Sequence, residues 1–113
     1  MTGSVITISD AEFTATALEP TSQLVIIYFW APWCGPCRLT APLMDWAASN
    51  YSDRLKVIKM EIDPNPETVA KYQVQGVPAL VLLRDGEVVA QNEGAIGKQK
   101  LIDLIEAHLP QQA

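Results

Sequence analysis

The segment that decides the fold is residues 24–38, which read Leu-Val-Ile-Ile-Tyr-Phe-Trp-Ala-Pro-Trp-Cys-Gly-Pro-Cys-Arg. Its first half, Leu24 to Trp30, is a bulky apolar and aromatic run without a charge, which is typical of a strand buried on both faces of a parallel sheet. After Cys37, apolar residues recur at helical spacing as far as Tyr51. The pattern therefore predicts a strand and then a helix, with Cys34 at or just before the first helical turn and Cys37 inside it.

The residues on either side of this segment predict further strands and helices. Val5 to Ile8 alternates weakly and predicts a first strand. Ser9 followed by Glu12 is a capping-box pattern, and it predicts a helix that runs to about Leu18. Beyond the cysteines, Pro42 lies inside the predicted helix and removes one amide donor, so we expect a kink there rather than an end.

The carboxyl-terminal half predicts three further strands and two helices. They are a strand over Leu55–Ile62, a short helix that begins at Pro66 after the cap Asn65, a hairpin of Ala79–Leu83 and Val88–Gln91 around Asp85-Gly86, and a last helix over Lys98–Leu109. The order is β-α-β-α-β-α-β-β-α, with helices that connect parallel strands and a hairpin at the end. This order predicts an α/β fold in which one sheet lies between helix layers.

Composition and charge limit the class of protein. A chain of 113 residues that is 49% hydrophobic and 19% charged fits one domain with a real core. The formal net charge is −5 and basic residues form no cluster, which argues against nucleic acid and anionic membranes as partners. The amino terminus lacks a secretory-signal pattern, and the apolar run after Leu24 is far shorter than the roughly 20 residues that span a bilayer. We therefore expect a cytoplasmic protein that does not bind a membrane.

The two cysteines carry the chemistry that the sequence suggests. A thiolate attacks disulfides and a thiol hardly does, and a helix amino terminus favours the anion through its free amide groups and dipole. Cys34 occupies such a position, and Cys37 lies one turn later, close enough to form a disulfide with it. We expect Cys34 to attack a substrate disulfide and Cys37 to resolve the mixed disulfide.

Other interpretations of the cysteines stay open from the residues alone. They could be ordinary core residues, or they could form a structural disulfide, although so short a loop removes little entropy from the unfolded chain. A zinc site needs about four ligands, and His108 is the one histidine that could join the two cysteines. We expect no metal, and we expect His108 to face solvent without a catalytic role.

With these residues in view, the sequence closely resembles the thioredoxins over nearly its whole length. Trp33-Cys34-Gly35-Pro36-Cys37 is the active-site motif of that family residue for residue, and Arg38 follows it where a basic residue is usual. Further matches occur in the same order as in the family: the kinking Pro42, the cis-proline segment Gly76-Val77-Pro78, the turn residue Gly86 and the groove residue Gly94. The resemblance implies the thioredoxin fold, a central mixed five-stranded sheet between helices, as a single domain over residues 1–113.

The resemblance also implies the roles of individual residues. Cys34 would be the nucleophile and Cys37 the resolving cysteine, with Gly35 and Pro36 supporting them. The Val77-Pro78 bond would be cis, with Pro78 against the cysteine pair, so that the backbone of Val77 could pair with an extended substrate segment. The apolar docking surface for substrates would consist of Trp33, Val77, Pro78, Gly94 and Ala95.

One departure from the family concerns position 28. Thioredoxins usually carry a buried aspartate there, which is thought to help deprotonate the resolving cysteine, and this chain has Tyr28. A phenol with a reference pKa of about 10 is a poor base near neutral pH. Lys59, which resembles the lysine that faces this aspartate, would lack its anionic partner. Tyr28 is then either a hydrogen-bonding spacer, with Cys37 deprotonated through water and with help from Lys59, or a residue that fills core volume.

The activity implied by the resemblance is reduction of protein disulfides by dithiol exchange, in electron transport and redox homeostasis. The partners would be client proteins with disulfides and a thioredoxin reductase linked to NADPH or to ferredoxin, and the protein would be a monomer. No cofactor is expected, because the dithiol carries the electrons. Two alternatives stay open: a disulfide oxidase or isomerase on the same fold, and a binding module that the cysteines only gate. Tyr28, together with the segment Glu61-Ile62-Asp63-Pro64-Asn65-Pro66, also resembles a cyanobacterial subgroup of the family.

Overall fold

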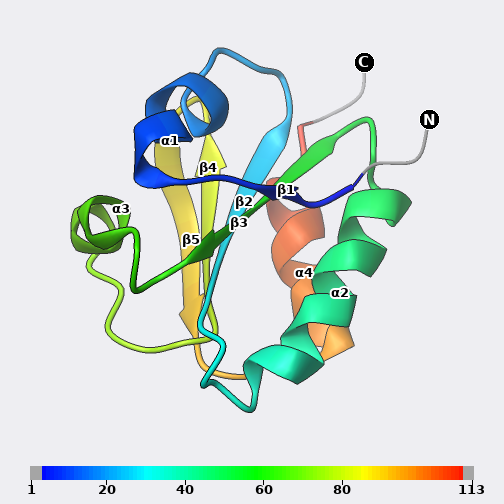
Figure 1. Cartoon of the computed structure of the whole chain (residues 1–113). Helices are drawn as coiled ribbons and strands as arrows, with labels where there is room; N and C mark the ends of the chain where they lie inside the picture. Colours follow the sequence, from blue (N-terminus) through cyan, green and yellow to red (C-terminus); the bar gives the residue numbers. More distant parts are fainter. Residues whose placement is uncertain (1–3, 111–113) are drawn as a thin grey trace.

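A five-stranded sheet runs through the middle of the computed structural model, which describes residues 4–110 (Figure 1). The strands are β1 (Ile6–Thr7), β2 (Leu24–Trp30), β3 (Leu55–Glu61), β4 (Ala79–Arg84) and β5 (Glu87–Glu93). Their order across the sheet is β1-β3-β2-β4-β5. The apolar run Leu24–Trp30 is therefore the central strand, with two strands on each side of it.

Helices cover both faces of this sheet. The helices α1 (Asp10–Ala17) and α3 (Pro66–Lys71) lie on one face, and α2 (Cys37–Asn50) and α4 (Lys98–His108) lie on the other (Figure 1). Among residues 4–110, no helix has the length and apolar character that crossing a membrane requires. The predicted element order and the mixed five-stranded sheet between helices are both confirmed, as one domain.

Strand β2 divides the core into two halves, because successive side chains of a strand point to opposite faces. Ile26 packs in the cluster that α2 and α4 cover, whereas Ile27 packs in the cluster beneath α1 and α3. Both side chains are fully buried. This explains why the strand carries no polar alternation: neither of its faces meets water.

One prediction about the connections is wrong. Strands β1, β2 and β3 are parallel and are joined through α1 and α2, as expected, but β4 runs antiparallel to β2. The connection from β3 to β4 passes through α3, which has only six residues. A six-residue helix rises about 9 Å, whereas a seven-residue strand spans roughly 23 Å. The helix alone therefore does not carry the chain back along the length of β3, and β4 begins at the end of the sheet where β3 ended.

The ends of the sheet also differ from the predicted bounds. Strand β1 pairs with β3 through Ile6 and Thr7 only, so it is shorter than the predicted Val5–Ile8. The hairpin is longer than predicted, and its turn is the expected one, with positive φ at Asp85 and Gly86. The outer strand β5 contains an irregularity in register opposite Leu82 and Leu83.

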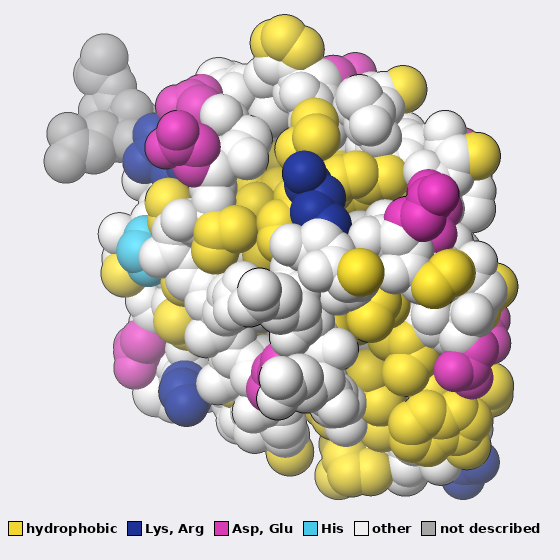
Figure 2. Space-filling view, turned by 90° about the vertical axis from the view of Figure 1, so that its left-hand side faces the viewer, with side chains coloured by type: hydrophobic (Ala, Val, Ile, Leu, Met, Phe, Trp, Pro, Cys, Tyr) yellow, Lys and Arg dark blue, Asp and Glu magenta, His cyan; other side chains and the backbone are white. Residues whose placement is uncertain are grey.

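Figure 2 shows the side of the molecule on which α1 and α3 lie. Hydrophobic side chains gather in a broad area at the lower end of this view. The lower end is also the end at which β2 leads into α2 in Figure 1. The apolar part of this face is therefore next to the strand-to-helix turn that holds both cysteines.

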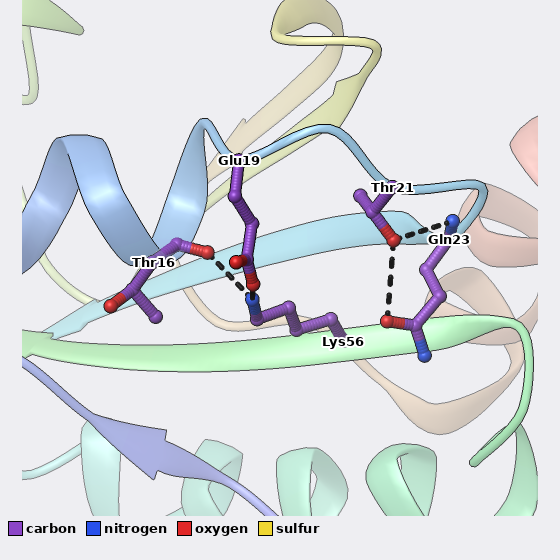
Figure 3. Close-up of polar contacts among 5 residues, drawn as sticks. All are labelled: Thr16, Glu19, Thr21, Gln23 and Lys56. Carbon is purple, nitrogen blue, oxygen red and sulfur yellow. Dashed lines mark hydrogen bonds and ion pairs between the residues drawn. The ribbon is translucent and has the colours of Figure 1, made fainter.

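The segment between α1 and β2 is anchored by a lysine from the neighbouring strand (Figure 3). The ammonium of Lys56 in β3 donates to the backbone carbonyl of Thr16 at 2.6 Å and forms an ion pair with Glu19. The Thr21 hydroxyl accepts a hydrogen bond from the backbone of Gln23 at 3.1 Å. A cation on a terminal helical carbonyl also opposes the negative end of the helix dipole.

Candidate active site

The two cysteines lie where the central strand turns into α2. Cys34 follows the end of β2 by four residues, and Cys37 is the first residue of α2. The structure holds them as a disulfide with a Cα–Cα distance of 5.4 Å. The backbone N–H of Cys37 donates to the sulfur of Cys34 at 3.2 Å. The first amide of the helix therefore points at the Cys34 sulfur, which is the environment that favours a thiolate.

The cysteine pair is largely covered in this disulfide form. Cys34 is 5% exposed and Cys37 is 3% exposed, so Cys34 is the more accessible of the two by a small margin. Together with Ala31 they form a small apolar cluster, and Ile62 and Val77 pack against it from neighbouring loops. A partner must therefore reach the pair across the apolar surface around it.

Trp33 is the large exposed side chain beside the disulfide. It is 67% exposed, and its indole N–H donates to the carboxylate of Asp63 at 3.0 Å. Asp63 follows β3, and the bond spans thirty positions of the chain. Asp63 is not among the site residues predicted from the sequence. Its place in a loop at the carboxyl end of a neighbouring parallel strand was the available signal.

The remaining residues of the predicted docking surface meet at the start of β4 and the end of β5. The Val77-Pro78 peptide bond is cis, as the resemblance implied. The backbone N–H of Gly94 donates to the carbonyl of Pro78 at 2.8 Å, which brings the two segments together. Gly94 has a φ of +99°, a conformation that favours glycine, and Ala95 next to it is exposed. The start of β4 and the end of β5 lie in the lower part of Figure 1, and Figure 2 shows the apolar area at the same end of the molecule.

Tyr28 lies directly behind the cysteines. It is 1% exposed, and its hydroxyl donates to the backbone carbonyl of Cys37 at 3.0 Å. Burial raises the pKa of Tyr28 to about 12, so the phenol is neutral at physiological pH. The side chain both fills the core and hydrogen-bonds to the first turn of α2, so the two interpretations of position 28 are compatible.

Lys59 has an aromatic neighbour in place of a carboxylate. Its ammonium lies 4.5 Å from the centre of the Trp30 ring. Within the described part of the chain, no carboxylate lies at ion-pair distance from it. A cation over the face of an indole is attracted by the ring quadrupole. Lys59 therefore keeps a favourable contact although the usual aspartate is absent.

Lys59 and Tyr28 also line two neighbouring cavities. One cavity, of about 210 Å³, lies beside the disulfide and is bounded by both cysteines, Trp30 and Arg38 as well. The other, of about 200 Å³, shares Tyr28, Lys59 and Ala41 with the first and extends away from the disulfide. The site thus has an apolar outer surface around Trp33 and a separate hollow behind the disulfide.

Comparison with known proteins settles the family. The family model named Thioredoxin matches residues 4–107. A thioredoxin-like protein of Synechocystis is 50% identical over 106 residues, which are 94% of this chain and 96% of the relative. Thioredoxin 1 of Synechococcus elongatus is 41% identical, with 90% and 94% covered, and thioredoxin of Bacillus subtilis is 39% identical, with 93% and 98% covered.

The chain belongs to the thioredoxin family. With a cysteine pair in disulfide geometry, membership of this family makes it a thiol-disulfide oxidoreductase, an enzyme of the protein-disulfide reductase class. A thioredoxin-type cysteine pair cycles between dithiol and disulfide and so carries electrons without an external cofactor.

The zinc interpretation finds no support at the thioredoxin-type cysteine pair. Within residues 4–110, no group of three His, Cys, Asp or Glu side chains could hold a metal ion. His108 is half-buried rather than fully solvent-facing, and it lies at the end of α4 that is remote from the strand-to-helix turn (Figure 1). Its backbone carbonyl accepts a hydrogen bond from Arg84 at 3.4 Å.

Proposed function

We propose that this protein reduces protein disulfides through Cys34 and Cys37, and that a thioredoxin reductase returns the oxidised pair to the dithiol. The observation that supports the proposal most directly is the N–H of Cys37 aimed at the Cys34 sulfur from the start of α2. In the reduced protein the same amide stabilises a Cys34 thiolate, so Cys34 is the nucleophile and Cys37 the resolving cysteine.

The reaction proceeds by two exchanges. The Cys34 thiolate attacks one sulfur of the substrate disulfide, forms a mixed disulfide and releases the other sulfur as a thiolate, which takes up a proton from water. The Cys37 thiolate then attacks the Cys34 sulfur and releases the second substrate thiol. Two electrons pass to the substrate, and the Cys34–Cys37 disulfide that results is the form seen in the structure.

In this proposal the substrate docks on the apolar surface of Trp33, Val77, Pro78, Gly94 and Ala95. The exposed indole of Trp33 supplies contact area, and the hydrogen bond that its N–H donates to the Asp63 carboxylate holds it in one orientation. Val77 packs against the cysteine cluster, so a segment paired with its backbone would lie close to Cys34. Gly35 and Pro36 support the turn between the two sulfurs.

The cellular setting is also part of the proposal. The protein acts as a cytoplasmic monomer in electron transport and redox homeostasis, and its electrons come from a reductase linked to NADPH or to ferredoxin. The relatives named thioredoxin in Pseudomonas aeruginosa and Bacillus subtilis support this assignment. The thioredoxin domain spans the whole chain, residues 1–113, in this interpretation.

The reduction potential of the Cys34–Cys37 pair decides between a reductase and an oxidase or isomerase. We expect equilibration against glutathione buffers, with the free thiols counted by alkylation, to give a potential near the value of about −270 mV that is known for thioredoxins. A potential near −120 mV, the range of a strong oxidant, would contradict the proposal.

Replacement of the nucleophile tests the binding-module alternative in the same assay. Cys34→Ser should lose reduction of insulin disulfides, whereas Lys100→Gln, at an exposed position of α4, should retain it. A Cys34→Ser variant that keeps the cellular function would show that the cysteines do not carry it.

A further inference from the structure

We propose that the cavity beside the disulfide is a binding site for small disulfides that carry a carboxylate, and that Lys59 and Arg38 recognise this charge. The proposal rests on the disulfide-reductase activity proposed above and adds a second substrate class to it. It concerns the hollow behind the disulfide and not the apolar surface around Trp33.

The walls of the cavity bring a reactive sulfur pair together with positive charge. Cys34 and Cys37 form part of its lining, and the side chains of Lys59 and Arg38 form another part. Within the described residues, its lining contains no Asp or Glu, although the whole chain carries a net charge of −5. An anion therefore meets a locally cationic cavity on a protein that otherwise repels it.

The cations of this cavity are available to a ligand. Within residues 4–110, neither Lys59 nor Arg38 has a carboxylate at ion-pair distance. Lys59 lies over Trp30, a contact that fixes its position but leaves the charge without an anionic partner. Asp45 lines the neighbouring cavity and not the cavity at the disulfide. Of the two cavities, the one nearest to the sulfurs is therefore the one with cationic and no acidic side chains in its lining.

The size of the cavity limits the ligand. A volume of about 210 Å³ holds roughly seven water molecules and is below the range of about 300–1,000 Å³ that is usual for drug-sized ligands. It suits one half of a small disulfide, a short alkyl chain that ends in a carboxylate. The Trp30 ring and the side chain of Ala41 give such a chain an apolar wall.

The reaction with such a compound, R–S–S–R, is balanced by the protein dithiol alone. The Cys34 thiolate attacks one sulfur, forms Cys34–S–S–R and releases RS⁻, which takes a proton from water. Cys37 then displaces the second RS⁻ and closes the Cys34–Cys37 disulfide. Two electrons leave the protein, and two molecules of RSH are formed.

The test compares three disulfides of similar size and different charge. Reduced protein is mixed with 3,3′-dithiodipropionate, with the neutral bis(2-hydroxyethyl) disulfide or with the cationic cystamine, and its oxidation is followed by acid quench, alkylation and mass measurement. The readout is the rate constant for the anionic disulfide divided by the rate constant for the neutral disulfide. A change in thiol acidity affects both rate constants alike and cancels in this ratio. Added salt should lower this ratio, since charges are screened over about 10 Å at 0.1 M.

The variants separate the cavity from general charge effects. Lys59→Gln and Arg38→Gln should each lower the ratio about three- to five-fold, the size expected for one partly screened charge pair. Lys59→Arg keeps the charge and should keep the ratio, and Lys100→Gln makes the same charge change on an exposed site of α4 and should leave it unchanged. Arg38 is exposed, so its replacement is informative even if Lys59→Gln fails to fold.

A change in the shape of the cavity gives an independent test. Ala41 lines both hollows, so Ala41→Leu should reduce the preference for the anionic probe while insulin reduction persists. The proposal is overturned if the ratio is the same in all variants, or if Ala41→Leu leaves the preference intact. A wild-type protein that reduces neither insulin nor any small disulfide would instead remove the proposed function itself.

Discussion

The hydroxyl of Tyr28 positions the start of α2 without carrying a charge. It donates to the carbonyl of Cys37 and so fixes the first turn of α2 behind the resolving cysteine. With a pKa of about 12, it stays protonated at any physiological pH and cannot accept the proton of Cys37. We therefore propose that the proton of Cys37 leaves through water in the neighbouring hollow, with help from Lys59, which lines it.

Replacement of Tyr28 by Phe separates the positioning role from a role in proton transfer. We expect Tyr28→Phe to lower the free energy of unfolding by about 1 kcal/mol, because one buried hydrogen bond is lost while the ring remains. The pH dependence of disulfide exchange between pH 6 and 9 should not change, because the phenol does not titrate there. Urea unfolding and stopped-flow exchange measure the two effects.

Tyr28→Asp is the contrasting variant at this position. It places a titratable carboxyl behind Cys37 and should alter the pH profile. If Tyr28→Phe itself removes an ionisation from the profile, the assignment of Tyr28 as a neutral donor is wrong.

For individual residues, the sequence predicted the position correctly where a family motif specifies the residue. Cys34, Cys37 and the cis bond before Pro78 lie where the resemblance placed them. The contact of Asp63 with Trp33 was not predicted, because it joins residues thirty positions apart. The position of Lys59 over Trp30 was missed as well, since periodicity indicates which face a side chain takes but not its neighbour across the sheet.

At the scale of helices and strands, the start of α3 depends on a residue of α1. The sequence predicted Asn65 as the cap, and Asn65 does precede the helix, but its side chain makes no capping bond. The carboxylate of Asp10 instead accepts hydrogen bonds from the backbone of Glu67 and Thr68, at 3.0 Å each, and from the Thr68 hydroxyl at 2.6 Å. Asn65 accepts the backbone N–H of Asp10 at 2.8 Å, so the two helix starts hold each other.

Asp10 should therefore make a pH-dependent contribution to stability. Burial raises its pKa, but the bonds from the Thr68 hydroxyl and from the backbone of Glu67 and Thr68 outweigh it, and the pKa lies below the usual 3.8. A carboxyl whose pKa is lowered in the folded state stabilises the fold at pH values above its pKa in the unfolded chain. This stabilisation is lost as the pH falls through the pKa of the folded state.

We expect Asp10→Ala to cost about 1 to 2 kcal/mol at pH 7, the size of a lost helix cap. The cost should shrink as pH falls below 3.8, because the native carboxyl then becomes protonated as well. Urea unfolding across this range measures it. Asp53→Ala, at an exposed aspartate, is the control, and an equal cost at pH 7 and at low pH would contradict the explanation.

The ends of helices and strands were predictable where a short sequence pattern, such as a capping box or a turn, determines them. The capping box at Ser9 and Glu12 is present, with the Ser9 N–H donating to Glu12 at 3.0 Å, and the Asp85-Gly86 turn forms as predicted. The direction of β4 was not predictable from its own residues. It depends on the path of the whole segment 62–78 between β3 and β4, of which the six-residue α3 is only a part, and local patterns do not specify that path.

At the scale of the whole molecule, the central strand divides the protein into two hydrophobic cores, one on each face of the sheet. Ile26→Val and Ile27→Val delete the same methyl group on opposite faces of β2, and both positions are fully buried. We expect each to lower the free energy of unfolding by about 1 kcal/mol in urea titrations. Ile6→Val, at a position that is 40% exposed, should change it by less than about 0.5 kcal/mol. A marked difference between Ile26 and Ile27 would show that one helix layer contributes little.

The outer strand β5 has a consequence for behaviour at high concentration. An unpaired strand edge is a template on which other copies can aggregate, and Val88 and Val89 make this edge partly apolar. Glutamates begin and end the strand, and the irregular register near its start disturbs the straight row of donors and acceptors that a growing fibril needs. The opposite edge, β1, offers only two residues. The sheet is thus open at both sides and still a poor seed for polymerisation.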